Sequence, residues 1–344
     1  MAENLVWLGD AGTNYATVVV KSMTAGTISL TGGTNDGPFS ADPAVNAGIV
    51  KFTVTGLSAN TSYPLAILQD GSPSATITAR TMPSGGNWAF GFGSCIHQAS
   101  PQHYAYQLVR DHDIRAWFAL GDTPYCDEGC AGYNGTLSQY RWMTGAATTS
   151  SYGNWQQGRV AWDITYELLQ RTPGWNFLTS RVPTYRMPDD HEYGNDWDWS
   201  VGNTTNFSPA ISTQADVDTV GYYSNLSSWD WNKGNPVNAD AEIGNWKPSS
   251  CADSATLHPP KYYRKTIGQV EFFHIDCFAH MDVDSKKDAP RTVCINDSWT
   301  AELGYTYSDP SGAALAKTRL GPKQLKWLLT HLIASRSEEH TSEL

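Results

Sequence analysis

Hydrophobic and polar residues are arranged differently in two parts of the chain. Residues 1–82 contain short β-branched runs at 17–21, 49–54 and 76–81, separated by Gly- and Asn-containing turns. This pattern predicts a small all-β domain. After Pro83–Gly86, which we expect to be a linker, longer apolar runs alternate with helical periodicity. Residues 87–335 are therefore predicted to form a second domain of the α/β class.

Four apolar runs in the second part predict buried strands: Trp88–Gly93, Ala116–Leu120, Val182–Met187 and Val270–Asp276. Helical periodicity predicts helices at 101–110, at 166–178 with a break at Pro173-Gly174, and from Leu320 to about Ser335. Residues 196–260 are rich in Trp, Asn and Ser and show little periodicity, so we expect long loops that flank a site.

The last nine residues, 336–344, read RSEEHTSEL, which is the translation of a common sequencing-adapter read. We therefore expect this segment to be an artefact and the native reading frame to be broken near Ser335, with an unknown length of chain lost. The alternative is a genuine polar tail. We exclude the segment from the prediction of the fold.

Length and charge limit the classes of function. A chain of 344 residues can bury a large core, and its net charge of −11 argues against a nucleic-acid-binding surface. A phosphate substrate remains compatible, because a bound metal ion can reverse the local field. No apolar run approaches the roughly 20 residues of a membrane helix, and no signal peptide is visible. Six cysteines permit three disulfides without fixing their pairing; Cys126 and Cys130 have zinc-like spacing, although a local disulfide or thiols fit better.

Three stretches place metal-ligating side chains at predicted strand ends: Gly93–Cys95, Gly121–Tyr125 and Asp189–Glu192. Alone, each has a simpler interpretation as a turn, a packed aromatic, a small buried hydrophobe or a helix cap. Their order along the chain, each after an apolar strand, favours a dinuclear site for phosphate-ester hydrolysis. Two metals would supply a bridging hydroxide as nucleophile and a clamp on the substrate.

Each residue of these stretches has an expected role. Asp122 is expected to bridge the metals, and Asp190 to bind the second one. Cys95 and Tyr125 would bind the first metal, where a phenolate favours Fe(III). His191 would donate a proton to the leaving oxygen or stabilise its charge.

These stretches resemble the PhoD-type alkaline phosphatases of the metallophosphoesterase superfamily. The matching segments are Phe90–Gln98, Leu120–Asp127, Val182–Asp196, Val270–Phe278 and Leu320–Leu332. The run from Gly56 to Tyr63 also resembles a fibronectin-III-type sandwich, in which the Tyr fills the corner between sheets. The resemblance implies a metallophosphoesterase-type α/β sandwich, incomplete at its C-terminus, after a fibronectin-III-like domain.

By the same resemblance, Cys95, Asp122 and Tyr125 would hold Fe(III), and Asp190 would hold a divalent ion. Calcium is expected there, with manganese, magnesium or zinc as alternatives. His191 would lie beside the phosphate of a small-molecule monoester or diester substrate. Further candidates for the site are His97, Arg186, Asn195 and Asp196. The resemblance also implies a periplasmic or extracellular location.

The chain departs from the family pattern in three places. Arg186 and Pro188 stand where small or apolar residues and Trp are usual, and Phe278–His280 replaces an Arg-rich stretch. A late Gly-Asp-x-His loop is expected beyond Ser335, so we expect the chain itself to bind metal weakly and to be impaired. The alternative function is a secreted polymer-binding or adhesion module with structural calcium and no catalysis. Its contact residues would be Trp197, Trp199, Trp229 and Trp231.

Overall fold

A computed structural model describes residues 4–98, 103–126, 160–193, 227–238, 244–245, 257–258, 261–277 and 320–341. Asn195, Asp196, Trp197 and Trp199 lie outside these residues, as do Cys130 and most of the predicted loop segment 196–260. In the described parts, no helix is both long and apolar enough to span a membrane.

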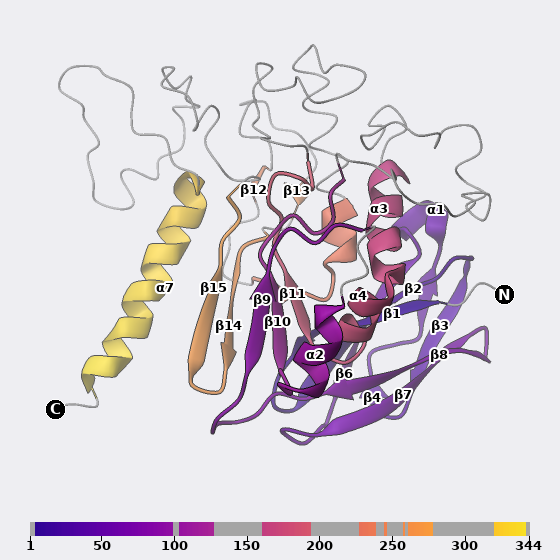
Figure 1. Cartoon of the computed structure of the whole chain (residues 1–344), viewed down its shortest axis with the longest axis horizontal. Coiled ribbons are helices and arrows are strands. Elements are labelled where there is room, and N and C mark those ends of the chain that lie inside the picture. The colour runs from indigo at the N-terminus through magenta and orange to yellow at the C-terminus, as the bar shows by residue number, and fades with distance from the viewer. Residues whose placement is uncertain are drawn as a thin grey trace, which may run out of the picture.

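The N-terminal strands form two four-stranded antiparallel sheets (Figure 1). One sheet has the order β1-β2-β6-β4, with β1 at Leu5–Ala11, β2 at Tyr15–Lys21, β6 at Ile49–Thr55 and β4 at Thr34–Asn35. The other has the order β5-β3-β7-β8, with β5 at Phe39–Ala41, β3 at Gly26–Thr31, β7 at Ser62–Gln69 and β8 at Ser72–Arg80. A short helix, α1 at Pro43–Asn46, precedes β6. Strands make up nearly all of the regular structure in this part, in agreement with the predicted all-β domain.

Strand β2 is buried on both of its faces. Val18 and Val20 belong to the core between the two sheets. Alternate side chains point to the other face, where Val19 is also fully buried, next to Gly234. At one end of β7, the Tyr63 hydroxyl accepts the Ser58 N–H at 2.7 Å, a contact of the tyrosine-corner type. The sandwich therefore presents a second apolar face to the rest of the chain, and the fibronectin-III-like assignment stays a prediction.

Three parallel strands follow in the order β11-β10-β9. They are β9 at Phe90–Gly93, β10 at Ala116–Ala119 and β11 at Thr184–Arg186. Helices α2 at Tyr104–Arg110, α3 at Val160–Arg171 and α4 at Pro173–Thr179 connect them. Trp117 of β10 and Trp175 of α4 share one buried cluster. The parallel arrangement brings all three strand ends to one edge of the sheet.

The fourth predicted strand is correctly located, but its pairing differs from a simple parallel series. Val270–His274, β15, pairs antiparallel with β14 at Tyr263–Ile267, which the hydrophobic pattern did not predict. The hairpin packs on the parallel sheet through Phe272, whose ring stacks on Phe118 at 4.3 Å. A further short pair joins β12, Gly244–Asn245, to β13, Leu257–His258.

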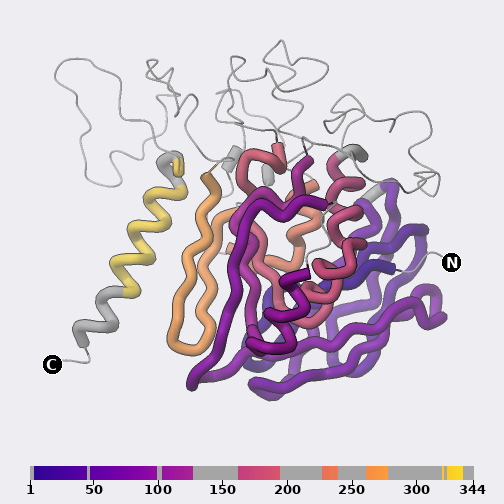
Figure 2. The backbone as a smooth tube through the Cα atoms, viewed as in Figure 1, coloured from indigo at the N-terminus to yellow at the C-terminus, as the bar shows by residue number. Residues whose placement is uncertain are grey.

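Helix α7 at Gly321–Thr341 lies on the outer side of this hairpin (Figures 1 and 2). It continues past Ser335, where the sequence pattern predicts its end. Trp327 contacts the rings of Tyr262 and Phe273, and the Gln324 side chain forms two hydrogen bonds of 2.6 Å with the backbone of Asp276. These contacts fix the helix beside the end of β15.

The sandwich and the parallel sheet share one continuous core, which includes Phe118 and Tyr185 from the sheet together with residues of both N-terminal sheets. A buried polar cluster crosses the same boundary. Asp10 of β1 pairs with Lys265 of β14 at 2.6 Å and accepts the Tyr185 hydroxyl at 3.1 Å. Strand β11 is therefore held against the sandwich, which fixes the position of its carboxyl end.

Candidate metal centre

Two tight turns direct side chains from β9 and β10 toward one point. Cys95 has φ 59° and Asp122 has φ 52°, both in the left-handed region that L residues rarely adopt. The two turns are hydrogen-bonded to each other, from Cys95 N–H to Gly121 C=O at 3.3 Å and from Ile96 N–H to Asp122 C=O at 2.8 Å. Such strained positions persist only where the surrounding structure enforces them. Here the strain places a thiol and a carboxylate side by side.

The Asp122 carboxylate touches donors from all three strand ends. Its Oδ2 accepts the Cys95 thiol at 3.4 Å and the Tyr125 hydroxyl at 3.3 Å. Its Oδ1 faces the His191 backbone N–H at 3.4 Å. Asp122 is 8% exposed, whereas the Cys95 side of the group is open to solvent. Asp122 is thus the geometric centre of the site.

Asp190 and His191 complete a second group around the same carboxylate. Each of Asp122, Asp190 and His191 offers a ligand atom, and these atoms all lie within 4.8 Å of one another. Burial raises the pKa of Asp122; the nearby His191 opposes the rise, and Asp190 adds to it by charge repulsion. A cation placed between the carboxylates would relieve this repulsion and favour their ionised forms.

Tyr125 lies between two histidines. Its ring centroid is 4.2 Å from that of His191 and 5.5 Å from that of His97. Burial, followed by the Cys95 hydrogen bond and the Asp122 charge, raises the pKa of the Tyr125 phenol. The phenol is therefore protonated unless a bound cation stabilises the phenolate. A metal ion would invert that preference.

Glu192 links the end of β11 to the end of β10 by hydrogen bonds. Its buried carboxylate accepts backbone N–H groups from Asp122 at 3.1 Å, Thr123 at 2.7 Å and Asp189 at 2.9 Å. Burial raises the pKa of Glu192 to about 8, and the N–H donors of Thr123 and Asp189 oppose that rise. The sequence alone assigns Glu192 no role, because a carboxylate that positions other groups and one that binds metal look alike in a run of acidic residues.

Gln98 holds Tyr125 in a similar way and was not predicted. Its side-chain amide both accepts the Tyr125 N–H and donates to the Tyr125 C=O, each at 3.1 Å. The Thr172 hydroxyl in turn donates to the Gln98 C=O at 2.9 Å. Thr172, between α3 and α4, is thereby linked through Gln98 to the backbone of Tyr125. No local pattern distinguishes this glutamine from a surface one.

Comparison with known proteins identifies a family over the part of the chain that contains the site. A family model described as PhoD-like phosphatase matches residues 90–340. The chain belongs to the PhoD-like phosphatase family. Among solved structures, one titled "Structure of PhoD" matches with a TM-score of 0.60 and 15% identity. The match covers 95% of this chain and 59% of that one, so the chain spans little more than half of the neighbour's length. No relative was found among curated proteins.

The donor set suits metal binding in this PhoD-like chain. Carboxylates, a thiol and a phenol converge from three strand ends, and these groups are anionic ligands when a metal ion is bound. Family membership and the cluster of Asp122, Asp190 and His191 both support the use of metal.

The structure brings together Cys95, Asp122, Tyr125, Asp190 and His191, with His97 at the edge of the group. Arg186 does not join them: its guanidinium donates to Gln170 Oε1 at 3.1 Å and lies over the rings of Trp7 and Trp175. Asn195 and Asp196 fall outside the described residues.

Trp231 was a predicted contact of the alternative polymer-binding function, but it is fully buried. Its ring stacks between Trp7 at 5.4 Å and Tyr166 at 5.7 Å, and its Nε1–H donates to Asp163 Oδ1 at 3.0 Å. This tryptophan packs the helix at 227–231 against the sandwich and offers no surface to a polymer.

Proposed function

We propose that this protein hydrolyses phosphate esters at a dinuclear metal centre built on Asp122. The observation that supports this most strongly is the contact of one carboxylate with groups from all three strand ends. A carboxylate in that position can bridge two ions, and phosphate-ester hydrolysis is the reaction that such pairs promote. Membership of the PhoD-like phosphatase family favours the same chemistry.

Roles follow from the contacts. Cys95 and Tyr125 would hold the first ion with Asp122, and a thiolate with a phenolate favours Fe(III). Asp190 would hold the second ion with Asp122; calcium is expected, with manganese, magnesium or zinc as alternatives. When bound, the pair would supply an activated water and neutralise charge on the phosphoryl oxygens. Because the described residues offer three ligands to one ion and two to the other, we also propose that the metals are held weakly and the activity is impaired.

His191 would act on the substrate itself. Its ring contacts that of Tyr125 in a tilted arrangement and has a nitrogen within 4.8 Å of ligand atoms on Asp122 and Asp190. From there it could donate a proton to the leaving oxygen as the ester bond breaks. Glu192 and Gln98 would keep the ligands in place without touching the substrate. The substrate would be a small phosphate monoester or diester, and the family resemblance favours a periplasmic or extracellular location.

Turnover of p-nitrophenyl phosphate and bis-p-nitrophenyl phosphate by the purified, metal-loaded protein tests this proposal. Asp122→Asn removes the bridging charge and should lower the rate by at least about a hundredfold. Asp111→Asn, a change at the exposed end of α2, serves as the matched control and should leave the rate unchanged. Equal rates in wild type and Asp122→Asn would contradict the proposal.

A further inference from the structure

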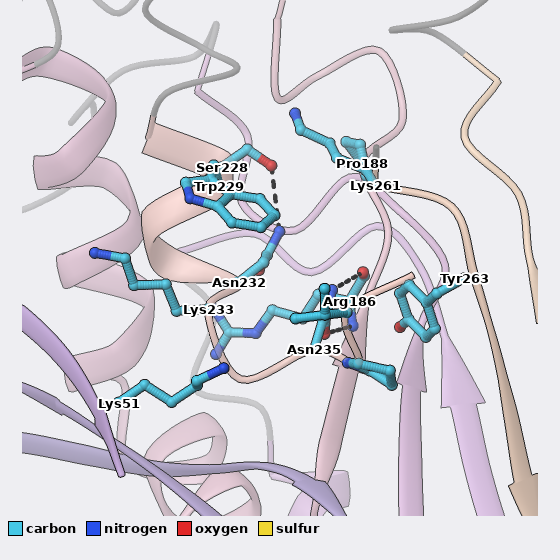
Figure 3. A pocket seen from close by; sticks show the side chains of 12 residues that line it. Lys51, Arg186, Pro188, Ser228, Trp229, Asn232, Lys233, Asn235, Lys261 and Tyr263 are labelled. Atoms are coloured by element: carbon cyan, nitrogen blue, oxygen red, sulfur yellow. Dashed lines mark hydrogen bonds between the residues drawn. The ribbon is translucent and has the colours of Figure 1, made fainter. Parts of the chain in front are cut away.

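A small cavity lies between the sandwich and the parallel sheet, away from the metal-ligating side chains (Figure 3). Its walls come from β6, from the end of β11, from residues 228–237 and from 261–263, and it has a volume of about 60 Å³. That is enough for several water molecules or for one tetrahedral oxyanion. Among the residues that the structure describes, its lining includes four cationic side chains, Lys51, Arg186, Lys233 and Lys261, and no carboxylate.

Arg186 is the most buried of these cations, with 4% of its surface exposed. Within the described residues its guanidinium makes one hydrogen bond, to Gln170, and has no carboxylate partner. Burial lowers the pKa of Arg186 to about 10. A buried charge is costly unless an opposite charge or several hydrogen bonds compensate it. Four of the five guanidinium N–H donors are not accounted for by the described residues.

Lys51 extends into the cavity from β6. Figure 3 shows its amine end and the guanidinium end of Arg186 directed toward the same part of the cavity. Lys51 is half-buried and forms no ion pair among the residues that the structure describes. Two like charges that converge in this way repel each other, and an anion between them would turn the repulsion into attraction.

The other two lysines of the cavity, Lys233 and Lys261, already have partners in the protein. Lys233 pairs with Asp230 and donates to the Ile49 C=O at 3.3 Å. Lys261 donates to the Tyr193 hydroxyl at 3.3 Å. Among the described residues, Lys51 and Arg186 are therefore the two cations of the cavity without a carboxylate or hydroxyl partner; the Arg186 guanidinium lies over the rings of Trp7 and Trp175 and donates to Gln170.

The wall beside Arg186 is rigid. The Asn235 side chain accepts the Arg186 N–H at 3.0 Å and donates to the Arg186 C=O at 2.7 Å, as a neighbouring strand would. Asn232 and Ser228 form a further polar pair, with Nδ2 donating to Oγ at 3.2 Å. The cavity thus combines fixed polar groups with two converging cations, which is the composition of a preformed oxyanion site.

We propose that this cavity binds a small oxyanion with two negative charges, held between Lys51 and Arg186, and that inorganic phosphate is one such ligand. The site is separate from the metal centre and shares no residue with it. Pro188 lines the cavity and lies two residues before Asp190, so a bound anion would stabilise the segment that leads to the metal-binding carboxylate.

Isothermal titration with inorganic phosphate tests the site. The protein used carries Asp122→Asn and Asp190→Asn and is kept in EDTA, so that phosphate cannot bind through metal ions. Phosphate should still bind, and sulfate should compete where chloride does not. Lys51→Gln, added to the same two substitutions, should lower the affinity for phosphate at least about tenfold, because one of two facing charges is lost. Lys326→Gln on α7 is the matched control and should leave the affinity unchanged.

Lys51 is only half-buried, so Lys51→Gln should fold normally, as circular dichroism will show. No phosphate binding by the metal-deficient protein would overturn the proposal, and so would equal affinity in the Lys51→Gln and Lys326→Gln variants. Neither result bears on phosphate-ester hydrolysis, which is measured with the metal-loaded protein.

Discussion

The Glu192 carboxylate accepts the backbone N–H of Asp122 at 3.1 Å, across a separation of seventy residues. The same carboxylate also accepts the N–H groups of Thr123 and Asp189. Three donors from two strand ends therefore converge on one buried side chain. The position of the central carboxylate depends on this group, because the turn that carries Asp122 is strained.

Replacing Glu192 by Ala should lower both the stability of the fold and the affinity of the metal centre. Three backbone donors would lose their acceptor, which costs about 3 kcal/mol or more in unfolding free energy. Metal affinity should fall by about tenfold to a hundredfold, as expected for groups that orient ligands. Urea unfolding and metal titration measure the two effects. Unchanged metal affinity in Glu192→Ala would contradict the positioning role.

Gly121 should not tolerate a side chain. Its φ is 103°, and a Cβ there would lie 2.3 Å from Cβ and 2.8 Å from the backbone N of Asp189. Gly121→Ala should destabilise the protein by about 3 kcal/mol, from backbone strain and overpacking together. Gly56→Ala is the matched control, because Gly56 has φ 73° but open space around it, and should cost about 1 kcal/mol. Equal losses of unfolding free energy would show that the contact with Asp189 does not matter.

His274 should make the fold sensitive to acid. It is stacked on Tyr263 and packed against the rings of Phe118 and Tyr185, and burial lowers its pKa from 6.5 to about 4. Between these values the unfolded chain binds a proton that the folded protein excludes, so stability falls as the pH decreases from 6.5 to 4. The loss from this group reaches about 3 kcal/mol.

His274→Phe keeps an aromatic ring in this apolar site and removes the titration. The difference in unfolding free energy between pH 7 and pH 4.5 should be about 2 kcal/mol smaller in the variant than in wild type, both measured without metal. The same pH dependence in both proteins would show that folding does not lower the pKa of His274.

Tyr125→Phe should distinguish the role of the Tyr125 hydroxyl in iron binding from the role of its ring in packing. The variant keeps the ring between His97 and His191 but loses the hydroxyl that contacts Asp122. A phenolate bound to Fe(III) absorbs visible light, so the iron-loaded wild type should show a phenolate band that the variant lacks, while any absorption from the Cys95 thiolate remains. Unfolding free energy should change by less than about 1 kcal/mol. An unchanged visible spectrum would exclude Tyr125 as a ligand.

The strand ends of the site could be predicted from the sequence because the information is local. The apolar runs at 116–120 and 182–187 stop at polar candidate ligands, and parallel strands place such ends at one edge. The contacts among Cys95, Asp122 and Tyr125 then follow from tight turns after adjacent strands.

Other features could not be predicted because they depend on partners far away in the sequence. Strand β14 was not predicted, since Arg264 and Lys265 break its apolar pattern; Lys265 is buried only because Asp10 neutralises it. Arg186 likewise lies in a cavity wall whose facing cation comes from β6. Trp231 was predicted to be a surface aromatic. Its stacking partner, Trp7, lies 224 positions earlier in the chain, so no local pattern indicated that it is buried.

Equilibrium dialysis of the protein against iron and a divalent metal, followed by elemental analysis, is the most direct test of a dinuclear centre bridged by Asp122. Wild type should contain iron together with a divalent metal. Asp190→Asn should lose the divalent metal and keep the iron, whereas Asp122→Asn should lose both because they share that ligand. Wild type without bound metal, or Asp122→Asn with the metal content of wild type, would contradict the account.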